Sequence, residues 1–403
     1  MEPGGRRDRN VKFPIYLDYH ATTPLDPRVL DAMMPYLTEH FGNAASRTHA
    51  FGLRAEAAVT VAREEVARAL SAEPREIVFT SGATESNNLA ILGAARASRA
   101  RGDHVVTSVL EHRAVLDPCR QLEKEGFRVT FVAPERNGVT SPESVAAALN
   151  GRTILVSVMA ANNEIGTLNP IGAIGRLCKE RGVLFHTDAA QAFGKVPLAV
   201  HELGVDLVSL SAHKICGPKG IGALWVRSLN PRVRLEPILW GGGHERGLRP
   251  GTLNVAGIAG FAAATRIALA EKESEGARVT ALRDRLERRL RAAIPGAFVN
   301  GGGADRLAGN LNICFPGVRA DNLMMDVRDV AVSAGSACTS AMPEPSHVLR
   351  GLGLSAEEAN ASIRFGLGRF TTEEEIDAAA ERFVTAVRRR QQAGTPRSPR
   401  PSS

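Results

Sequence analysis

The sequence predicts an α/β protein with a mostly parallel sheet, helices on both faces of that sheet, and a smaller α+β domain after it. Six short apolar segments alternate with helical patterns up to about residue 225, and they lie at 77–79, 105–106, 129–132, 154–158, 183–185 and 207–210. Continuous apolar runs of this length are typical of strands that are buried on both faces of a parallel sheet. A helical pattern over residues 255–293 then leads to shorter, turn-rich strand patterns, which indicate the smaller domain.

The other elements follow from the spacing of apolar residues. In residues 54–70, apolar side chains recur every three or four positions and therefore share one helical face. Residues 89–92 belong to a second apolar helix that opens after a Ser/Gly/Thr turn. In the smaller domain we expect strands at 311–315 and 362–365 and a final helix over residues 372–390.

The 403 residues are too many for one small core, so we expect two domains. The large domain is expected over residues 14–262 and the small domain over residues 263–388, including a loop at about 333–345. Residues 1–13 are expected to form a disordered leader. Residues 389–403, rich in Arg, Pro and Ser, are expected to form a disordered basic tail.

Composition excludes several classes of protein. Apolar content of 44% and charged content of 23% are typical of a soluble globular enzyme. No apolar run approaches the ~18 residues that a membrane helix needs. No apolar segment follows Arg6, Arg7 and Arg9, so a secretory signal is not expected. The five cysteines are an odd set without a C-x-x-C pair, which argues against a disulfide framework or a zinc ribbon and favours a reducing cytoplasm.

The net charge of +7 does not by itself indicate a nucleic-acid partner. Arginines alternate with acidic residues, as in the stretch 283–288, and this pattern is typical of a solvated helix face with mixed charges. We therefore expect neither membrane association nor direct binding of nucleic acid.

One thiol lies in a segment of small residues. In residues 333–340 the sequence is Ser-Ala-Gly-Ser-Ala-Cys-Thr-Ser, so Cys338 has little apolar bulk around it and is expected on an exposed, mobile loop. A small-residue turn with an incidental cysteine explains this octet equally well. The stretch Ser211-Ala212-His213-Lys214, whose chemistry needs a nearby thiol, favours a functional Cys338.

Three features at predicted strand ends match the needs of pyridoxal phosphate. The turn at residues 80–88 opens a helix and offers backbone N–H groups to a phosphate, although an ordinary helix cap has the same pattern. Asp188 follows one strand and would hold a ring nitrogen protonated. Lys214 follows another strand, and a desolvated lysine amine forms Schiff bases, although such a lysine can also reach water or pair with a carboxylate. Together these groups suit pyridoxal phosphate, and no metal is required.

The chain resembles the cysteine desulfurases of the class V aminotransferase group, and most of all the housekeeping type that feeds iron–sulfur cluster assembly. The resemblance covers about residues 14–380, and its motifs are Tyr16-Leu17-Asp18-Tyr19, Ala21-Thr22-Thr23-Pro24, Phe79 to Ser86, Glu111-His112, Asn162-Asn163-Glu164-Ile165-Gly166, His213-Lys214, Gly217-Pro218-Lys219-Gly220, Gly241 to Arg246 and the Cys338 loop. It implies a fold-type I pyridoxal-phosphate transferase that forms a homodimer.

The resemblance also implies a role for each site residue. Cys338, Lys214 and His112 would be catalytic: Lys214 holds pyridoxal 5'-phosphate, and His112 stacks on its ring and shuttles protons. The cofactor would contact Ala83, Thr84, Asn163, Asp188, Gln191, Ser211, His213, Lys214 and Thr252, with the phosphate on Ala83, Thr84, Ser211 and His213, the ring nitrogen on Asp188, the ring hydroxyl facing Gln191, and Thr252 donated across the dimer interface. Asn163 and Arg364 would bind the substrate carboxylate.

The implied reaction removes sulfur from L-cysteine and gives L-alanine and a persulfide on Cys338. The sulfur would pass to an acceptor protein, either a scaffold for iron–sulfur clusters or a relay for tRNA thiolation, in the cytoplasm. A class V aminotransferase and a selenocysteine lyase are the alternative enzymes. A non-catalytic scaffold is disfavoured because Lys214 and Cys338 are both present.

Four features depart from the pattern of the family. Ala212 stands where glycine is common, Pro250 where serine is frequent, and Cys216 where an aromatic residue is usual. The C-terminal extension with which housekeeping desulfurases dock the cluster scaffold is not recognisable after residue 388, which leaves scaffold docking open.

Overall fold

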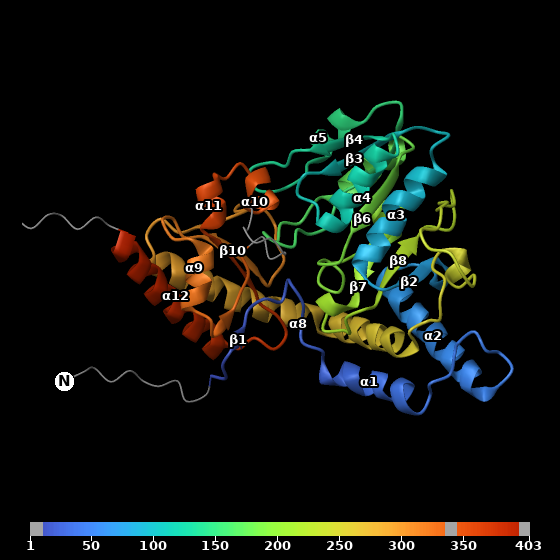
Figure 1. The fold of residues 1–403 in the computed structure, drawn as a ribbon, viewed down its shortest axis with the longest axis horizontal. Helices are drawn as coiled ribbons and strands as arrows, with labels where there is room; N and C mark the ends of the chain where they lie inside the picture. The colour runs from blue at the N-terminus through green and yellow to red at the C-terminus, as the bar shows by residue number, and fades with distance from the viewer. Residues whose placement is uncertain (1–10, 335–344, 395–403) are drawn as a thin grey trace, which may run out of the picture.

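The computed structural model describes residues 11–334 and 345–394, and its main feature is a seven-stranded sheet of order β2-β8-β7-β6-β5-β3-β4 (Figure 1). The strands are β2 (Ile77–Thr80), β3 (His104–Ser108), β4 (Arg128–Val132), β5 (Thr153–Ser157), β6 (Leu184–Asp188), β7 (Leu207–Ser211) and β8 (Gly222–Val226). Strands β3 to β7 pair in parallel, and β8 runs antiparallel to both β7 and β2. The predicted mostly parallel α/β sheet is confirmed.

Helices cover both faces of this sheet (Figure 1). They are α1 (Pro27–Thr38), α2 (Ala50–Ala69), α3 (Ala83–Ala97), α4 (Arg113–Lys124), α5 (Pro142–Ala148), α6 (Ile171–Glu180), α7 (Val200–Leu203) and α8 (Val255–Ala293). Ile77 and Phe79 of β2 pack in one core with α2, α6 and α8, whereas Val78 packs in a second core with α3 and α4. This alternation follows from the two-residue period of a strand.

Helix α8 passes from the core of the sheet into a separate core. Its first half contributes Phe261 to the core beneath the sheet, and its second half contributes Leu282, Leu286 and Leu290 to a cluster around the smaller sheet. Asn254 caps the helix by accepting a hydrogen bond from the backbone N–H of Gly257. The helix spans the range that the sequence predicts, and the predicted domain boundary at residue 262 falls inside it.

The smaller core surrounds two short sheets. One has the antiparallel order β12-β10-β9, and the other pairs β1 with β11 in parallel. The elements are β1 (Ile15–Tyr16), β9 (Phe298–Val299), β10 (Asn310–Cys314), β11 (Val330–Ala331), β12 (Ser362–Gly366), α9 (Ala320–Asp326), α10 (His347–Gly351), α11 (Ala356–Asn360) and α12 (Glu373–Gly394). Ile15 and Leu17 pack in this core, although the predicted domain boundaries group them with the large domain.

The final helix is longer than predicted. Helix α12 runs to Gly394, so the predicted tail, which starts at residue 389, begins inside this helix. The reason is an ion-pair cluster: Arg389 and Arg390 both contact the carboxylate of Asp326 in α9, at 3.0 and 2.6 Å. The rest of the predicted tail, the first ten residues of the predicted leader and residues 335–344 lie outside the described residues. In the part of the chain that is described, no helix is long and apolar enough to cross a membrane.

Candidate active site

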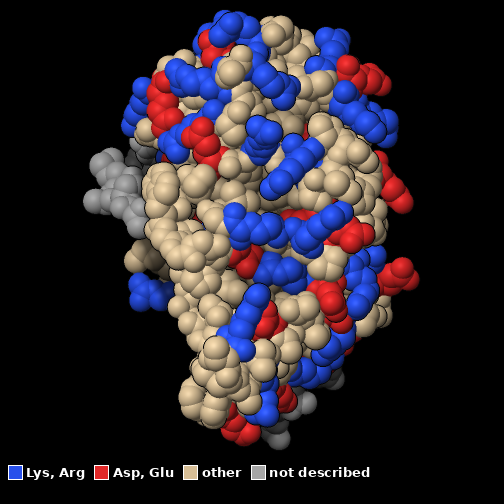
Figure 2. Space-filling view, turned by 90° about the vertical axis from the view of Figure 1, so that its right-hand side faces the viewer, with Lys and Arg blue, Asp and Glu red and all other residues tan. Residues whose placement is uncertain are grey.

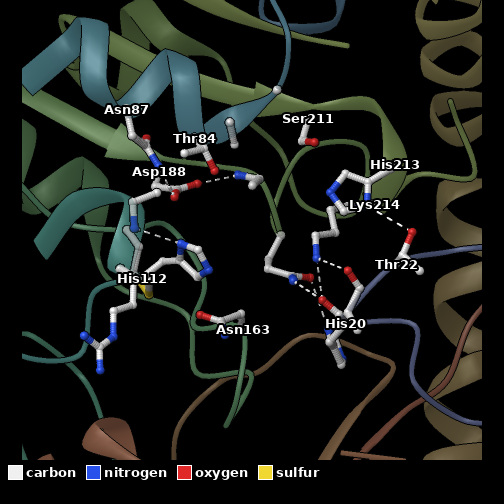
Figure 3. Close-up of a pocket in the computed structure, with 18 of the residues that line it drawn as sticks. His20, Thr22, Thr84, Asn87, His112, Asn163, Asp188, Ser211, His213 and Lys214 are labelled. Atoms are coloured by element: carbon white, nitrogen blue, oxygen red, sulfur yellow. Dashed lines mark hydrogen bonds between the residues drawn. The ribbon is translucent and has the colours of Figure 1, made fainter. Parts of the chain in front are cut away.

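A cavity of about 730 Å³ lies where the parallel strands of the large sheet end (Figure 3). Most of the predicted site residues line it: Ala83, Thr84, His112, Asn163, Asp188, Gln191, Ser211, His213, Lys214 and Arg364. Thr252 is exposed and does not line the cavity of its own chain, and Cys338 lies outside the described residues. The fold therefore brings together side chains that are up to 281 positions apart in the sequence, from Ala83 to Arg364.

The start of α3 forms the end of the cavity that suits an anion. Gly82 precedes the helix with φ of 150°, a conformation that favours glycine. The turn lies close against β8, since a Cβ atom on Gly222 would come within 2.7 Å of the Cα atom of Gly82. The N–H groups of the first helical turn have no acceptor within the helix and lie at the positive end of its dipole. Thr84 and Ser211 both line the cavity and are labelled in Figure 3, and their hydroxyl groups suit a phosphate site.

The carboxylate of Asp188 is buried and well partnered at the end of β6. Its Oδ2 atom accepts a hydrogen bond from Nδ2 of Asn87 at 2.6 Å, and its Oδ1 atom accepts one from the backbone N–H of Ala190 at 2.9 Å. Such bonds are needed because a buried carboxylate without partners is costly. Each oxygen can accept a further bond, so Asp188 suits a protonated ring nitrogen. Asn87 was not among the predicted site residues; the signal that could have found it is a polar residue on the sheet-facing side of an apolar helix.

Lys214 ends a short 3-10 turn, residues Ala212–Lys214, that directly follows β7. Its Nζ atom donates hydrogen bonds to the carbonyl oxygens of His20 at 2.6 Å and Ala21 at 2.7 Å. Burial, with contributions from Lys195 and Arg364, lowers the pKa of Lys214 to about 7. A large share of the amine is therefore neutral and nucleophilic near neutral pH, as Schiff-base formation with an aldehyde requires.

His112 stands exposed to the cavity at the start of α4. Its Nδ1 atom accepts a hydrogen bond from the backbone N–H of Ala114 at 3.1 Å, so the neutral ring carries its proton on Nε2. Burial is the main cause that lowers the pKa of His112, which favours this neutral form. The Nε2–H group is then available to a substrate or to a stacked ring in the cavity (Figure 3).

Gln191 and His213 are engaged with the segment that follows β1. The Nε2 atom of Gln191 donates to the carbonyl oxygen of His20 at 2.9 Å, and its Oε1 atom lies 3.1 Å from Nδ1 of the same histidine. The Nδ1 atom of His213 lies 3.1 Å from Oγ1 of Thr22, and burial lowers the pKa of His213 to about 4. His20 and Thr22 line the cavity as well, and neither was among the predicted site residues.

Arg364 and Asn163 lie away from the anion-binding turn. The Nη1 group of Arg364 donates to the backbone carbonyl of Asn163 at 3.0 Å, and Asn163 is distant from Thr84 and Ser211 in Figure 3. The Nε group of Arg364 is buried and has no partner among the described residues. A buried guanidinium N–H without an acceptor points to an anionic ligand at this end of the cavity.

The chemical groups that line the cavity match those that pyridoxal 5'-phosphate needs. Free N–H groups, an anchored carboxylate and a partly neutral lysine amine line one cavity, in the positions that a phosphate, a ring nitrogen and an aldehyde need. Within residues 11–334 and 345–394, no group of His, Cys, Asp and Glu side chains is arranged to hold a metal ion.

Comparisons with known proteins show which proteins the chain resembles. Residues 15–379 match the family described as aminotransferase class-V. The chain is 57% identical over 379 residues to the cysteine desulfurase IscS of Anaeromyxobacter dehalogenans, covering 94% of each chain, and 59% identical over 368 residues to that of Methylobacillus flagellatus, covering 91% of this chain and 90% of the relative. A solved NifS-like protein superposes with a TM-score of 0.86 at 36% identity, covering 93% of this chain and 99% of its own. A structure described as SspA in complex with cysteine superposes with a TM-score of 0.78 at 38% identity, covering 89% and 100%.

Proposed function

This chain belongs to the class V aminotransferase family and is a cysteine desulfurase, and we propose that its cavity binds pyridoxal 5'-phosphate and L-cysteine while Cys338 receives the sulfur. The observation that carries this proposal is that Lys214 and Asp188 line one cavity. The lysine amine has a pKa of about 7, and the Asp188 carboxylate is fixed by Asn87. A structural lysine at a strand end would need neither feature.

Four groups would hold the cofactor. Lys214 would bind its aldehyde carbon, Asp188 its ring nitrogen, and the first turn of α3 with Ser211 its phosphate, while His112 would cover one face of the ring. When bound, pyridoxal phosphate supplies an electron-accepting ring that stabilises the negative charge formed when a proton leaves Cα of the substrate.

The protein's own residues perform the proton transfers and the positioning. Arg364 and Asn163 hold the carboxylate of L-cysteine, for which the Nε group of Arg364 is available. The neutral amine of Lys214 accepts the Cα proton, and its pKa near neutrality suits a general base. The Nε2–H group of His112 donates a hydrogen bond to the sulfur of the substrate or of Cys338 and so stabilises a thiolate there.

The Cys338 thiolate attacks the sulfur atom of L-cysteine, a sulfur–sulfur bond forms and the Cβ–S bond breaks. The thiol proton and the Cα proton return to carbon, so that thiolate plus L-cysteine give L-alanine plus the Cys338 persulfide anion. The persulfide then passes its sulfur to an acceptor protein for iron–sulfur cluster assembly or tRNA thiolation.

A homodimer is supported by exposed apolar side chains. Trp240 is 80% exposed, and the exposed rings of Phe41 and Phe51 stack with centroids 5.3 Å apart. Figure 2 shows the side of the molecule that carries the start of α2 and the loops near residue 240. This side has a broad uncharged area beside scattered Lys and Arg. Burial of such surface against a second copy is favourable, and it would bring Thr252 to the partner's cavity.

A cytoplasmic location is supported by the cysteines. The four that the structure describes, Cys119, Cys178, Cys216 and Cys314, are buried free thiols. Free thiols of this kind are typical of proteins in a reducing compartment.

The test is the stoichiometry of products from L-cysteine. We expect the cofactor-loaded enzyme, with a reducing thiol present, to release L-alanine and sulfide one to one. A keto acid in place of alanine would contradict the proposal and favour the aminotransferase alternative.

A further inference from the structure

A serine near each end of the Cys338 segment is bound to a carboxylate. Ser333 lies just before residues 335–344, and its Oγ atom donates to Oδ2 of Asp18 at 2.9 Å. Ser346 lies just after them, and its Oγ atom donates to Oε2 of Glu164 at 2.5 Å. All of these groups except Asp18 are buried, with Ser333 and Ser346 at 6% and 4% exposure. Both ends of the segment are therefore tied to acidic side chains from distant parts of the chain.

Asp18 also binds the proposed substrate arginine. Its Oδ1 atom accepts a hydrogen bond from Nη2 of Arg364 at 2.9 Å, so one carboxylate joins Arg364 to Ser333. The backbones of these two residues exchange hydrogen bonds as well, at 2.7 Å from the N–H of Arg364 and 3.2 Å from that of Ser333. The start of the Cys338 segment is thus fixed directly to the strand that presents Arg364.

Glu164 fixes the second end of the Cys338 segment, at Ser346. It directly follows Asn163, whose carbonyl oxygen binds Arg364, and its own carbonyl oxygen accepts hydrogen bonds from Asn310 and Asn312 of β10 at 3.2 and 3.1 Å. Ser346 is in turn the N-cap of α10, where its Oγ atom accepts from the backbone N–H of Leu349. Glu164 therefore fixes the helix start at which the described chain resumes.

We propose that Asp18 and Glu164 are positioning residues for sulfur transfer, each fixing one end of the Cys338 segment relative to the guanidinium of Arg364. The inference rests on the proposed function, because it takes Arg364 as the site of the substrate carboxylate. A thiolate must come within about 3–3.5 Å of the sulfur that it attacks, and a displacement of about 1 Å can cost about a hundredfold in rate. Fixed ends limit the positions that the thiol of an intervening segment can reach.

Matched serine variants of the holoenzyme test the Glu164 end. Ser346→Ala removes the bond to Glu164 and a helix cap, whereas Ser355→Ala removes only the cap of α11, whose serine bonds within its own helix to Glu358. We expect Ser346→Ala to slow persulfide formation on the Cys338 peptide about tenfold or more in a single turnover, at unchanged KM. Ser346→Thr should recover most of this rate. Ser355→Ala should stay within about twofold of the wild type.

Two further variants separate the two bonds of Asp18. Ser333→Ala should slow persulfide formation and leave the affinity for L-alanine, a carboxylate ligand without sulfur, unchanged in an absorbance titration of the bound cofactor. Asp18→Asn, which keeps an acceptor for Ser333 but turns an amide or a neutral oxygen toward Arg364, should weaken L-alanine binding about tenfold.

Equal losses in Ser346→Ala and Ser355→Ala, or unchanged persulfide formation in both Ser333→Ala and Ser346→Ala, would overturn the inference. Failure of the proposed function would instead appear in the wild type, as the absence of any Cys338 persulfide.

Discussion

The amine of Lys214 donates a 2.6 Å hydrogen bond to the carbonyl oxygen of His20, a residue 194 positions earlier in the chain. Together with the 2.7 Å hydrogen bond to the carbonyl oxygen of Ala21, this contact fixes the position of the amine in the cavity. Burial disfavours the charged form of the amine and so lowers its pKa. Carbonyl oxygens stabilise an ammonium group less than a carboxylate would, so about half of the amine is deprotonated at pH 7. The cavity therefore presents a nucleophile that is ready at neutral pH.

Cofactor attachment to the apoprotein should depend on pH through Lys214. Because its pKa is lowered to about 7, the neutral fraction of the amine rises about tenfold per pH unit below 7 and levels off above about pH 8. We expect the rate of attachment, followed by visible absorbance after mixing with pyridoxal phosphate, to have this shape. A rate that continues to rise toward pH 10 would mean that the lysine has an ordinary pKa, and that burial does not activate it.

Cys338→Ala should separate cofactor binding from sulfur transfer. The variant lacks the thiolate that accepts sulfur, so we expect full cofactor absorbance and no sulfide above the buffer control. Cys216→Ala is the matched control. Its thiol follows the Lys214 turn but is buried, and burial raises the pKa of Cys216, so it is inert as a nucleophile. Turnover in Cys216→Ala should stay within about twofold of the wild type, and sulfide release by Cys338→Ala would remove Cys338 from the mechanism.

Asp188→Asn should reduce turnover without loss of the fold. The substitution keeps an acceptor for the backbone N–H of Ala190 and places an NH2 group toward Asn87, which can accept it by turning its unpartnered Oδ1 atom inward. It removes the charge that stabilises a protonated ring nitrogen. A charged hydrogen bond contributes about 1.5–3 kcal/mol, so we expect kcat for alanine formation to fall about ten- to a hundredfold at saturating cofactor. Asn87→Ala, which leaves the charge of Asp188 in place, should cost less. A wild-type kcat in Asp188→Asn would show that Asp188 does not act on the ring nitrogen.

The sequence predicts those parts of the site that lie at strand ends. Asp188 and Lys214 each follow an apolar run, and the topology of a parallel sheet then places such residues on one edge. Asp18 could not be found in this way. Its partners Ser333 and Arg364 lie 315 and 346 positions away, and no local pattern records contacts at such separations.

The long elements of the fold could be predicted from the sequence, and some of the short ones could not. The long helix α8 follows from its periodicity alone, but the antiparallel strand β8 was missed. The ten residues between β7 and β8 hold the 3-10 turn of Lys214 in place of a crossover helix, so the helical pattern that marks the other strands is absent there. The pairing of β1 with β11 was missed because each strand has only two residues, too few for a visible alternation.

The buried ion pair between Arg63 and Glu245 should contribute strongly to stability. The guanidinium contacts both carboxylate oxygens, at 2.6 and 2.8 Å, and Glu245 also accepts a hydrogen bond from the backbone N–H of Phe79. The pair fastens the loop before Thr252 to α2. Arg63→Ala leaves the charge of Glu245 buried with a side-chain exposure of 3%, a change that typically costs about 3–5 kcal/mol.

The comparison for this pair is Arg47→Ala, which removes an exposed salt bridge to Glu56. Exposed pairs contribute about 0–1 kcal/mol because water screens both charges. We expect thermal unfolding of the cofactor-free protein to shift to clearly lower temperature in Arg63→Ala and by no more than about a degree or two in Arg47→Ala. Equal shifts would show that Glu245 is stabilised by Phe79 and the surrounding backbone, with no need for the Arg63 guanidinium.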